Sequence, residues 1–205
     1  MTSILEVEQL DTLSSNASST LTIGGDNTST INLGASGKSI VIPSGATITN
    51  NGTQTGFGGE NTPAFRATRT TNQTLTDGSN TKIQFNSEDF DTDSCYDNAT
   101  NYRFTPTVAG KYLIGTQIRM LSDGNTLLAT TNVILYKNGS AHTSSPTNFR
   151  NNQINGQTYF LSDIITFNGS TDYVEVYVNA DVDSGGIIAA GGSACHFFGY
   201  KLIGA

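Results

Sequence analysis

The chain has 205 residues, of which 36% are hydrophobic and 13% are charged, and its formal net charge at pH 7 is −7. A chain of this length can bury one sizeable core and carry an extension. Its ten Lys and Arg residues are scattered singly through an acidic sequence. This excludes a nucleic-acid binder, because such a protein needs a positive surface to neutralise phosphates. An anionic membrane surface would repel the chain for the same reason.

The composition also favours β structure. The low charge content is made up by Thr, Ser, Asn and Gly, which favour strands and turns over helices. No run of about 18 apolar residues occurs, so the sequence predicts no membrane-spanning segment. Residues 1–13, MTSILEVEQLDTL, lack the basic and apolar regions of a signal peptide.

Residues 1–19 are predicted to be an N-terminal anchor. Hydrophobic side chains recur at near-helical spacing over residues 3–13, with acidic residues between them. A helix this short is marginal alone, so we expect it to pack against copies of itself or against an anchoring surface. The alternative is an unstructured tail.

Residues 20–60 are predicted to be a β-repeat stalk that ends in a hinge. Short alternating pieces such as STINLGASG and SIVIPSG are separated by Gly-rich turns. Each piece is too short to bury a core, but such repeats are stable when stacked within one chain or wound between three chains. The segment resembles the β-rich shafts of phage fibre and tail proteins. The Gly-rich residues 55–61 then predict a flexible hinge.

Residues 61–205 are predicted to be an all-β head. Turn dipeptides of the kind that favours tight hairpins recur along it, as Asp-Gly at 77–78 and 123–124 and Asn-Gly at 138–139, 155–156 and 168–169. Between them, residues 111–120 and 172–180 alternate cleanly in hydrophobicity. We expect Tyr112 and Ile114 to share one face of the first strand, and Val174 and Val176 to point inward from the second.

The order of aromatic residues in this head resembles the globular head of the complement q-subcomponent. The motif is carried by Phe85, Asp91, Tyr96, Phe104, Gly110 and Tyr112. The run PAFRATRT from residue 63 is similar to the first strand of that family, and CHFFGYKLIG from residue 195 is similar to its last. The resemblance covers residues 63–205. It implies a ten-strand jelly roll of the tumour-necrosis-factor-like superfamily, whose members are usually trimers that bind rather than catalyse.

The resemblance also implies where three copies would meet. In that family, strands equivalent to those around Tyr112, Tyr177 and residues 197–200 line the threefold axis. The predicted trimer-interface residues are Tyr112, Tyr177, Phe198 and Tyr200. The alternative is that some of these rings fill the core of a single chain, because alternate strand residues point in opposite directions.

An acidic loop lies between the two halves of the motif. Glu88, Asp89, Asp91 and Asp93 fall close together, and carboxylate oxygens are ligands that Ca²⁺ prefers. Asp91 and Asp93 are therefore the candidate ligands of a calcium site, although the spacing of an EF-hand is absent. The alternative is a solvated loop that keeps the head soluble, and no other cofactor is expected.

The residues that could support catalysis do not form a recognisable set. His142 lies in a polar stretch, and His196 follows Cys195 in an apolar one, so the two neighbours are expected on opposite faces of a strand. Cys195 is predicted to be a buried thiol, with a bridge to Cys95 as the alternative. The sequence therefore predicts a protein that is not an enzyme.

Together these features predict a homotrimeric bacteriophage virion protein on the particle surface, a capsid decoration or head fibre or a short tail fibre. It would stabilise the particle or attach to host surface glycans, with residues 1–60 docking onto other virion proteins. The alternatives are a bacterial surface or extracellular trimeric adhesin and a glycan-active enzyme that uses Asp91 or Asp93.

Overall fold

The computed structural model describes residues 37, 39–49, 51, 61–123, 127–183 and 186–203. The chain divides into two units, residues 1–54 and residues 55–205. The helix predicted within residues 3–13 and the hinge predicted before residue 61 lie outside the described residues.

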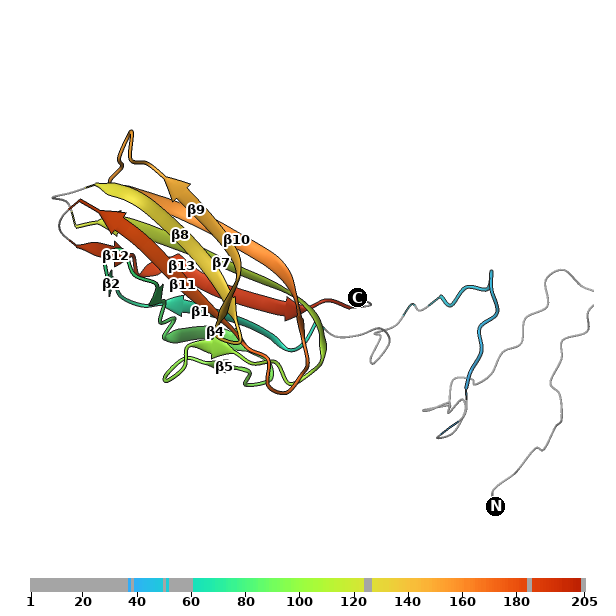
Figure 1. Ribbon diagram of the computed structural model, residues 1–205. Coiled ribbons are helices and arrows are strands. Elements are labelled where there is room, and N and C mark those ends of the chain that lie inside the picture. The colour runs from blue at the N-terminus through green and yellow to red at the C-terminus, as the bar shows by residue number, and fades with distance from the viewer. Residues whose placement is uncertain are drawn as a thin grey trace, which may run out of the picture. The chain divides into compact units, whose positions relative to one another are not determined.

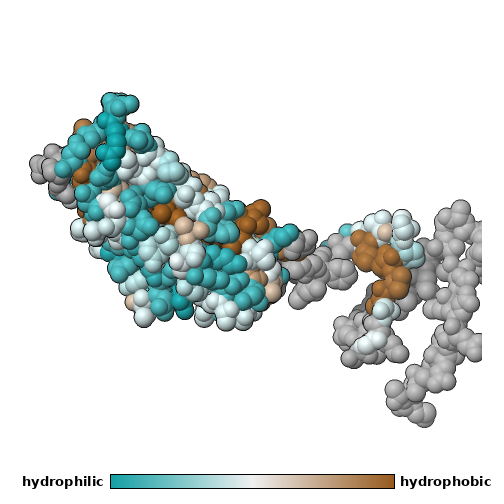
Figure 2. All heavy atoms as spheres, viewed as in Figure 1, coloured by the Kyte–Doolittle hydropathy of each residue, from teal (hydrophilic) through white to brown (hydrophobic). Residues whose placement is uncertain are grey.

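The described part of the first unit is an exposed, irregular segment. Residues 39–49 contain no strand, and their one turn is closed by the Ala46 amide, which donates to the Pro43 carbonyl at 3.1 Å. Ile40, Val41, Ile42 and Ile48 are exposed and give this segment a hydrophobic area (Figure 2). Short aliphatic segments form a ladder only when another strand lies beside them. The strands predicted within residues 39–49 are accordingly not seen in the single chain.

The second unit is the head, and its described residues form thirteen strands and no helix. The strands are β1 (Ala64–Arg69), β2 (Gln73–Leu75), β3 (Thr81–Lys82), β4 (Ser87–Asp91), β5 (Tyr96–Asp97), β6 (Arg103–Phe104), β7 (Gly110–Ser122), β8 (Leu128–Lys137), β9 (Ser140–Asn148), β10 (Gly156–Phe167), β11 (Val174–Val182), β12 (Ile187–Ala189) and β13 (Gly192–Lys201). The count exceeds the expected ten because β2, β3, β5, β6 and β12 are segments of two or three residues.

The strands form two antiparallel sheets that pack as layers (Figure 1). Sheet A has the order β2-β12-β7-β13-β1-β4, and β10 pairs along the other side of β7. Sheet B has the order β5-β6-β11-β8-β9, with β3 added beside β11. The first strand of the head and the last lie side by side in sheet A, where β1 pairs with β13.

The alternation predicted for two strands is confirmed. In β7, Tyr112 and Ile114 are buried, and in β11 Val174 and Val176 are buried, so each strand turns one face into the space between the sheets. The turn predicted at residues 138–139 joins β8 to β9, with φ of +52° at Asn138 and +78° at Gly139, as a type I′ hairpin requires.

An aromatic cluster joins the two sheets at one end of the core. Phe65 of β1 lies 4.3 Å from Phe104 of β6 and 5.0 Å from Tyr96 of β5, measured between ring centroids, and both pairs are stacked. Phe197 of β13 meets Phe65 edge-on at 4.9 Å. The Tyr96 hydroxyl donates to the Phe85 carbonyl at 3.1 Å, and burial raises the pKa of that hydroxyl.

Gly110 completes the motif as a backbone element. Its φ is +151°, and a Cβ atom added there would lie 2.9 Å from Cε of Lys201. A glycine is therefore required at the point where β7 begins, as the sequence predicted. The four motif positions Phe85, Tyr96, Phe104 and Gly110 thus act in the core and in the entry to a central strand.

Asp97 at the end of β5 makes the stability of the head depend on pH, which allows this architecture to be tested. Its carboxylate accepts hydrogen bonds from the amides of Thr100 at 2.8 Å, Ala99 at 3.0 Å and Asn101 at 3.1 Å. These bonds, the one from Thr100 first, lower the pKa of Asp97 from 3.8 to about 2. A folded-state pKa below the unfolded one gives stability at pH above about 4 that is lost as the pH falls through the folded value.

We predict that Asp97→Asn makes the free energy of unfolding fall less steeply between about pH 4 and pH 2 than it does in the wild type. Denaturant unfolding at each pH measures the slope, and a ¹³C NMR titration of the Asp97 carboxyl measures its pKa directly. A midpoint near the ordinary value of 3.8 would contradict this account of the loop.

Candidate functional site: the aromatic face of sheet A

The outer face of sheet A carries large apolar side chains that have no covering layer in the single chain. Phe160 is 60% exposed, Ile164 55% and Phe90 50%. These side chains point outward because their neighbours in the strand point into the core; in β10, Tyr159 and Leu161 are buried on either side of Phe160.

The pairing register aligns outward-facing residues from five strands in one row. Arg66 of β1 pairs with Phe90 of β4 on one side and with Phe198 of β13 on the other. Phe198 then pairs with Gly115 of β7, and Gly115 pairs with Ser162 of β10. Two phenylalanines from distant parts of the chain therefore lie on one line across the sheet.

A second row runs beside it. Leu113 of β7 pairs with Tyr200 of β13 and with Ile164 of β10. Phe160 lies on the far side of the first row, with its ring centroid 6.1 Å from that of Phe198 in a stacked arrangement. We call the set formed by these rows the aromatic face; its residues are Phe90, Leu113, Phe160, Ile164, Phe198 and Tyr200.

Gly115 gives the aromatic face its shape. A Cβ atom at this position would lie 2.4 Å from Cζ of Phe198 and 2.7 Å from its Cε1. The Phe198 ring therefore lies over the backbone of β7 in the space that a side chain would fill, which flattens the centre of the face. A flat apolar surface of this kind is typical of a protein interface.

Arg66 and His196, which lie beside Phe198 on this face, carry little free charge. Arg66 forms an ion pair with Asp89. Burial, followed by the charge of Arg66, lowers the pKa of His196, so its imidazole stays neutral at pH 7. Desolvation of the centre of the face is therefore not opposed by a free charge on these two residues, whereas Lys111 and Arg119 lie exposed toward the two ends of β7 on the same side.

The predicted interface residues do not all lie together. Phe198 and Tyr200 belong to the aromatic face. Tyr112 does not, and the prediction for it was wrong: it is fully buried, and its hydroxyl donates to the Val108 carbonyl at 2.7 Å. Tyr177 lies on the outer face of the other sheet, with its ring centroid 4.2 Å from that of Tyr136.

Sequence reasoning missed Phe90, Phe160 and Ile164. The signal for the last two was present, because residues 157–167 alternate and buried residues occupy positions 159, 161, 165 and 167. Large apolar side chains at the even positions are unexpected on a solvated face and mark it as a surface that is covered by something.

The carboxylates predicted to bind calcium are used within their own loop. Asp91 accepts from the Tyr96 amide at 2.7 Å, and Asp93 accepts from the Thr92 hydroxyl at 2.7 Å. Across the described residues, no three His, Cys, Asp or Glu side chains gather as metal ligands. The calcium site at Asp91 and Asp93 stays a prediction.

The two cysteines and the two histidines are not arranged so that they could react with one another. Cys95 and Cys195 are both buried free thiols, so the alternative of a bridge between them is excluded, and burial raises the pKa of each. Cys195 points into the core while His196 lies on the outer face of sheet A. His142 lies 3.7 Å from Asp163, measured from Nε2 to Oδ2, with its side chain 40% exposed.

Solved structures similar to the chain share this fold at low sequence identity. Eiger TNF from S. frugiperda superposes with a TM-score of 0.52 at 11% identity, over 69% of this chain and 93% of that one. Murine APRIL at pH 5.0 gives 0.50 at 9% identity, over 68% and 98%. The globular domain of zebrafish complement 1qA protein gives 0.47 at 14% identity, over 68% and 97%.

The head has the tumour-necrosis-factor-like jelly-roll fold. This confirms the fold expected from the arrangement of Phe85, Tyr96, Phe104 and Gly110. No family model and no curated protein sequence matches the chain. Within the described residues, no helix is both long enough and apolar enough to cross a membrane.

We predict that Gly115→Ala lowers the free energy of unfolding by about 1–3 kcal/mol, because the new methyl group overlaps the Phe198 ring. In the double variant Gly115→Ala/Phe198→Ala most of that cost should disappear, since the ring is gone. Denaturant unfolding of the four proteins at one protomer concentration measures this coupling. Strictly additive effects would show that Phe198 does not lie over Gly115.

Proposed function

We propose that this protein is a homotrimer in which the aromatic face of each head packs against another copy. The observation that carries the proposal is the exposure of Phe160, Ile164 and Phe90 on a face where Arg66, paired in register with Phe90 and Phe198, forms an ion pair with Asp89. Leaving such a surface in water is costly, and a closed symmetric assembly covers it in every copy at once. The resemblance to a superfamily whose members are usually trimers favours three copies.

The trimer serves as a binding or stabilising module of a bacteriophage particle, as a capsid decoration, a head fibre or a short tail fibre. Support comes from the residues before the head, whose short alternating pieces resemble phage fibre shafts. Among the described ones, Ile40, Val41 and Ile42 expose aliphatic side chains that three chains wound together would cover. Residues 1–60 dock onto other virion proteins, and the head faces outward, where it stabilises the particle or attaches to host surface glycans.

A role in binding rather than catalysis fits the chemistry of the head. The thiol of Cys195 is buried away from His196, and Asp91 and Asp93 are engaged by their own loop. Neither arrangement offers a nucleophile with a base beside it, which covalent catalysis requires.

The particle location is tested with an antibody against the head and electron microscopy of a lysate from the bacterium that carries the gene. Gold label on phage particles is the expected result. Label confined to cell-envelope fragments, with none on particles, would overturn the virion location and favour the bacterial adhesin.

We predict a solution mass of about 65 kDa by light scattering for the full chain, three times the 21.7 kDa of one copy. Phe160→Lys places a charge on the aromatic face and should shift the mass to that of one chain. Val108→Lys, at a residue 42% exposed outside that face, is the matched control and should leave the trimer intact. A wild-type chain that stays monomeric would overturn the trimer.

A further inference from the structure

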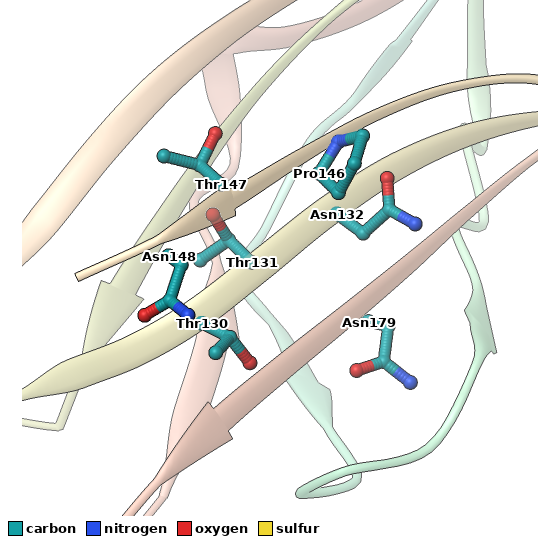
Figure 3. Close-up of a pocket in the computed structure, with 7 residues that line it drawn as sticks. All are labelled: Thr130, Thr131, Asn132, Pro146, Thr147, Asn148 and Asn179. Carbon is teal, nitrogen blue, oxygen red and sulfur yellow. The ribbon is translucent and has the colours of Figure 1, made fainter. Parts of the chain in front are cut away.

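The outer face of sheet B carries a polar groove that is not part of the proposed contact between copies. It has a volume of about 450 Å³ and crosses β8, β9 and β11 (Figure 3). All of its lining residues are uncharged: Thr130, Thr131, Asn132, Pro146, Thr147, Asn148 and Asn179.

The register places three asparagines close together in this groove. Asn132 of β8 pairs with Asn179 of β11 on one side and with Pro146 of β9 on the other. One step along the face, Thr130 pairs with Asn148. Side-chain amides from three neighbouring strands therefore line the groove, with Asn132 between Asn179 and Pro146.

Among the side-chain amides of these asparagines, one oxygen has no hydrogen-bond partner. Asn179 Nδ2 donates to Asn80 Oδ1 at 3.0 Å, and Asn148 Oδ1 accepts from the Arg150 amide at 2.9 Å. The side-chain oxygen of Asn132 is buried and has no hydrogen-bond partner. Since buried polar groups are nearly always satisfied, the unpaired oxygen of Asn132, between Asn179 and Pro146, points to a hydrogen-bond partner from outside the chain.

An aromatic pair continues the surface along the same strands. Tyr177 lies two residues before Asn179 on the same face of β11, and its ring packs against Tyr136 with centroids 4.2 Å apart. Asn80 joins the two parts, because its Nδ2 donates to the Tyr136 hydroxyl at 2.8 Å while its Oδ1 accepts from Asn179.

A second hollow of about 540 Å³ adjoins the groove through Asn148 and is lined by residues 148–152 and Ile154. It carries the ring of Phe149 and the amides of Asn151 and Asn152. The polar surface is therefore long enough for a chain-like ligand and not confined to a single small molecule.

The chemistry of this surface defines the ligand class. The groove is lined by amides and hydroxyls, which both donate and accept, together with the C–H surfaces of Pro146 and threonine methyl groups. Arg150, which lines the adjoining hollow, forms an ion pair with Asp181. An anionic ligand therefore finds no free positive charge, whereas sugar hydroxyls match the amides and sugar C–H faces match the rings of Pro146 and Tyr177.

We propose that this groove binds a neutral oligosaccharide, with Asn132 and Asn179 hydrogen-bonding its hydroxyls. The inference rests on the proposed function, because it assigns the attachment role to a surface of the outward-facing head. It is compatible with the trimer, since the groove lies on the opposite side of the sandwich from the aromatic face and stays open when the copies associate.

The test is saturation-transfer difference NMR on the full chain. The neutral probes are maltotriose, chitotriose and methyl α-D-mannoside, and the anionic probes are N-acetylneuraminic acid and glucuronic acid. The variants are Asn179→Ala and Asn132→Ala, each of which removes one side-chain amide from the groove. Asn98→Ala is the matched control, because it lies in the connection between β5 and β6 at the other end of β11.

Transfer to a neutral probe in the wild type is expected, with affinity lower by about fivefold in each groove variant, the effect of one lost hydrogen bond. Asn98→Ala should bind as the wild type does. No transfer to any neutral probe, transfer unchanged in both groove variants, or transfer to the anionic probes alone would each overturn the proposal.

Light scattering on the same samples separates the two proposals. If the wild type is a trimer but does not bind as expected, the groove assignment is wrong and the proposed trimer stands. A monomeric wild type would instead contradict the proposed trimer. Asn132→Ala and Asn179→Ala should keep the wild-type mass and far-ultraviolet circular dichroism, which shows that any loss of binding is local.

Discussion

The stacking of Phe65 on Phe104 is the contact on which the rest of the head depends. It joins β1 of sheet A to β6 of sheet B at 4.3 Å between ring centroids, and Phe197 closes the cluster from β13. Because side chains alternate along a strand, an inward Phe197 requires an outward Phe198, and an inward Phe65 requires an outward Arg66. The core therefore determines which residues reach solvent, and a slip of one residue would exchange the two sets.

The two outer faces that result have different chemistry, and this difference underlies the proposed division of roles. Sheet A presents phenylalanine, isoleucine and leucine over a flat centre shaped by Gly115, which suits a permanent contact with another copy. Sheet B presents asparagine, threonine and tyrosine around an unpaired amide, which suits a ligand rich in hydroxyl groups. One face can hold the copies together while the other remains available to the surroundings.

The sequence predicted the fold through features that act locally. Alternation placed Tyr112, Ile114, Val174 and Val176, and the Asn138-Gly139 dipeptide gave the hairpin it predicts. The four candidate interface residues do not share one surface, because alternation tells which residues share a face of one strand but not which strands share a sheet. Tyr177 is outward as expected, yet β11 belongs to sheet B, and no local pattern could show that. The groove depends on register across β8, β9 and β11, so the sequence could not predict it.

Hydroxyl-radical footprinting of the full chain is the most direct test of the claim that the aromatic face is a self-interface. It measures side-chain accessibility, and the single chain exposes Phe160 by 60%, Ile164 by 55% and Val108 by 42%. The account predicts strong protection of Phe160 and Ile164 in the wild type, with Val108 modified freely. Oxidation of Phe160 and Ile164 in proportion to those single-chain exposures would contradict it.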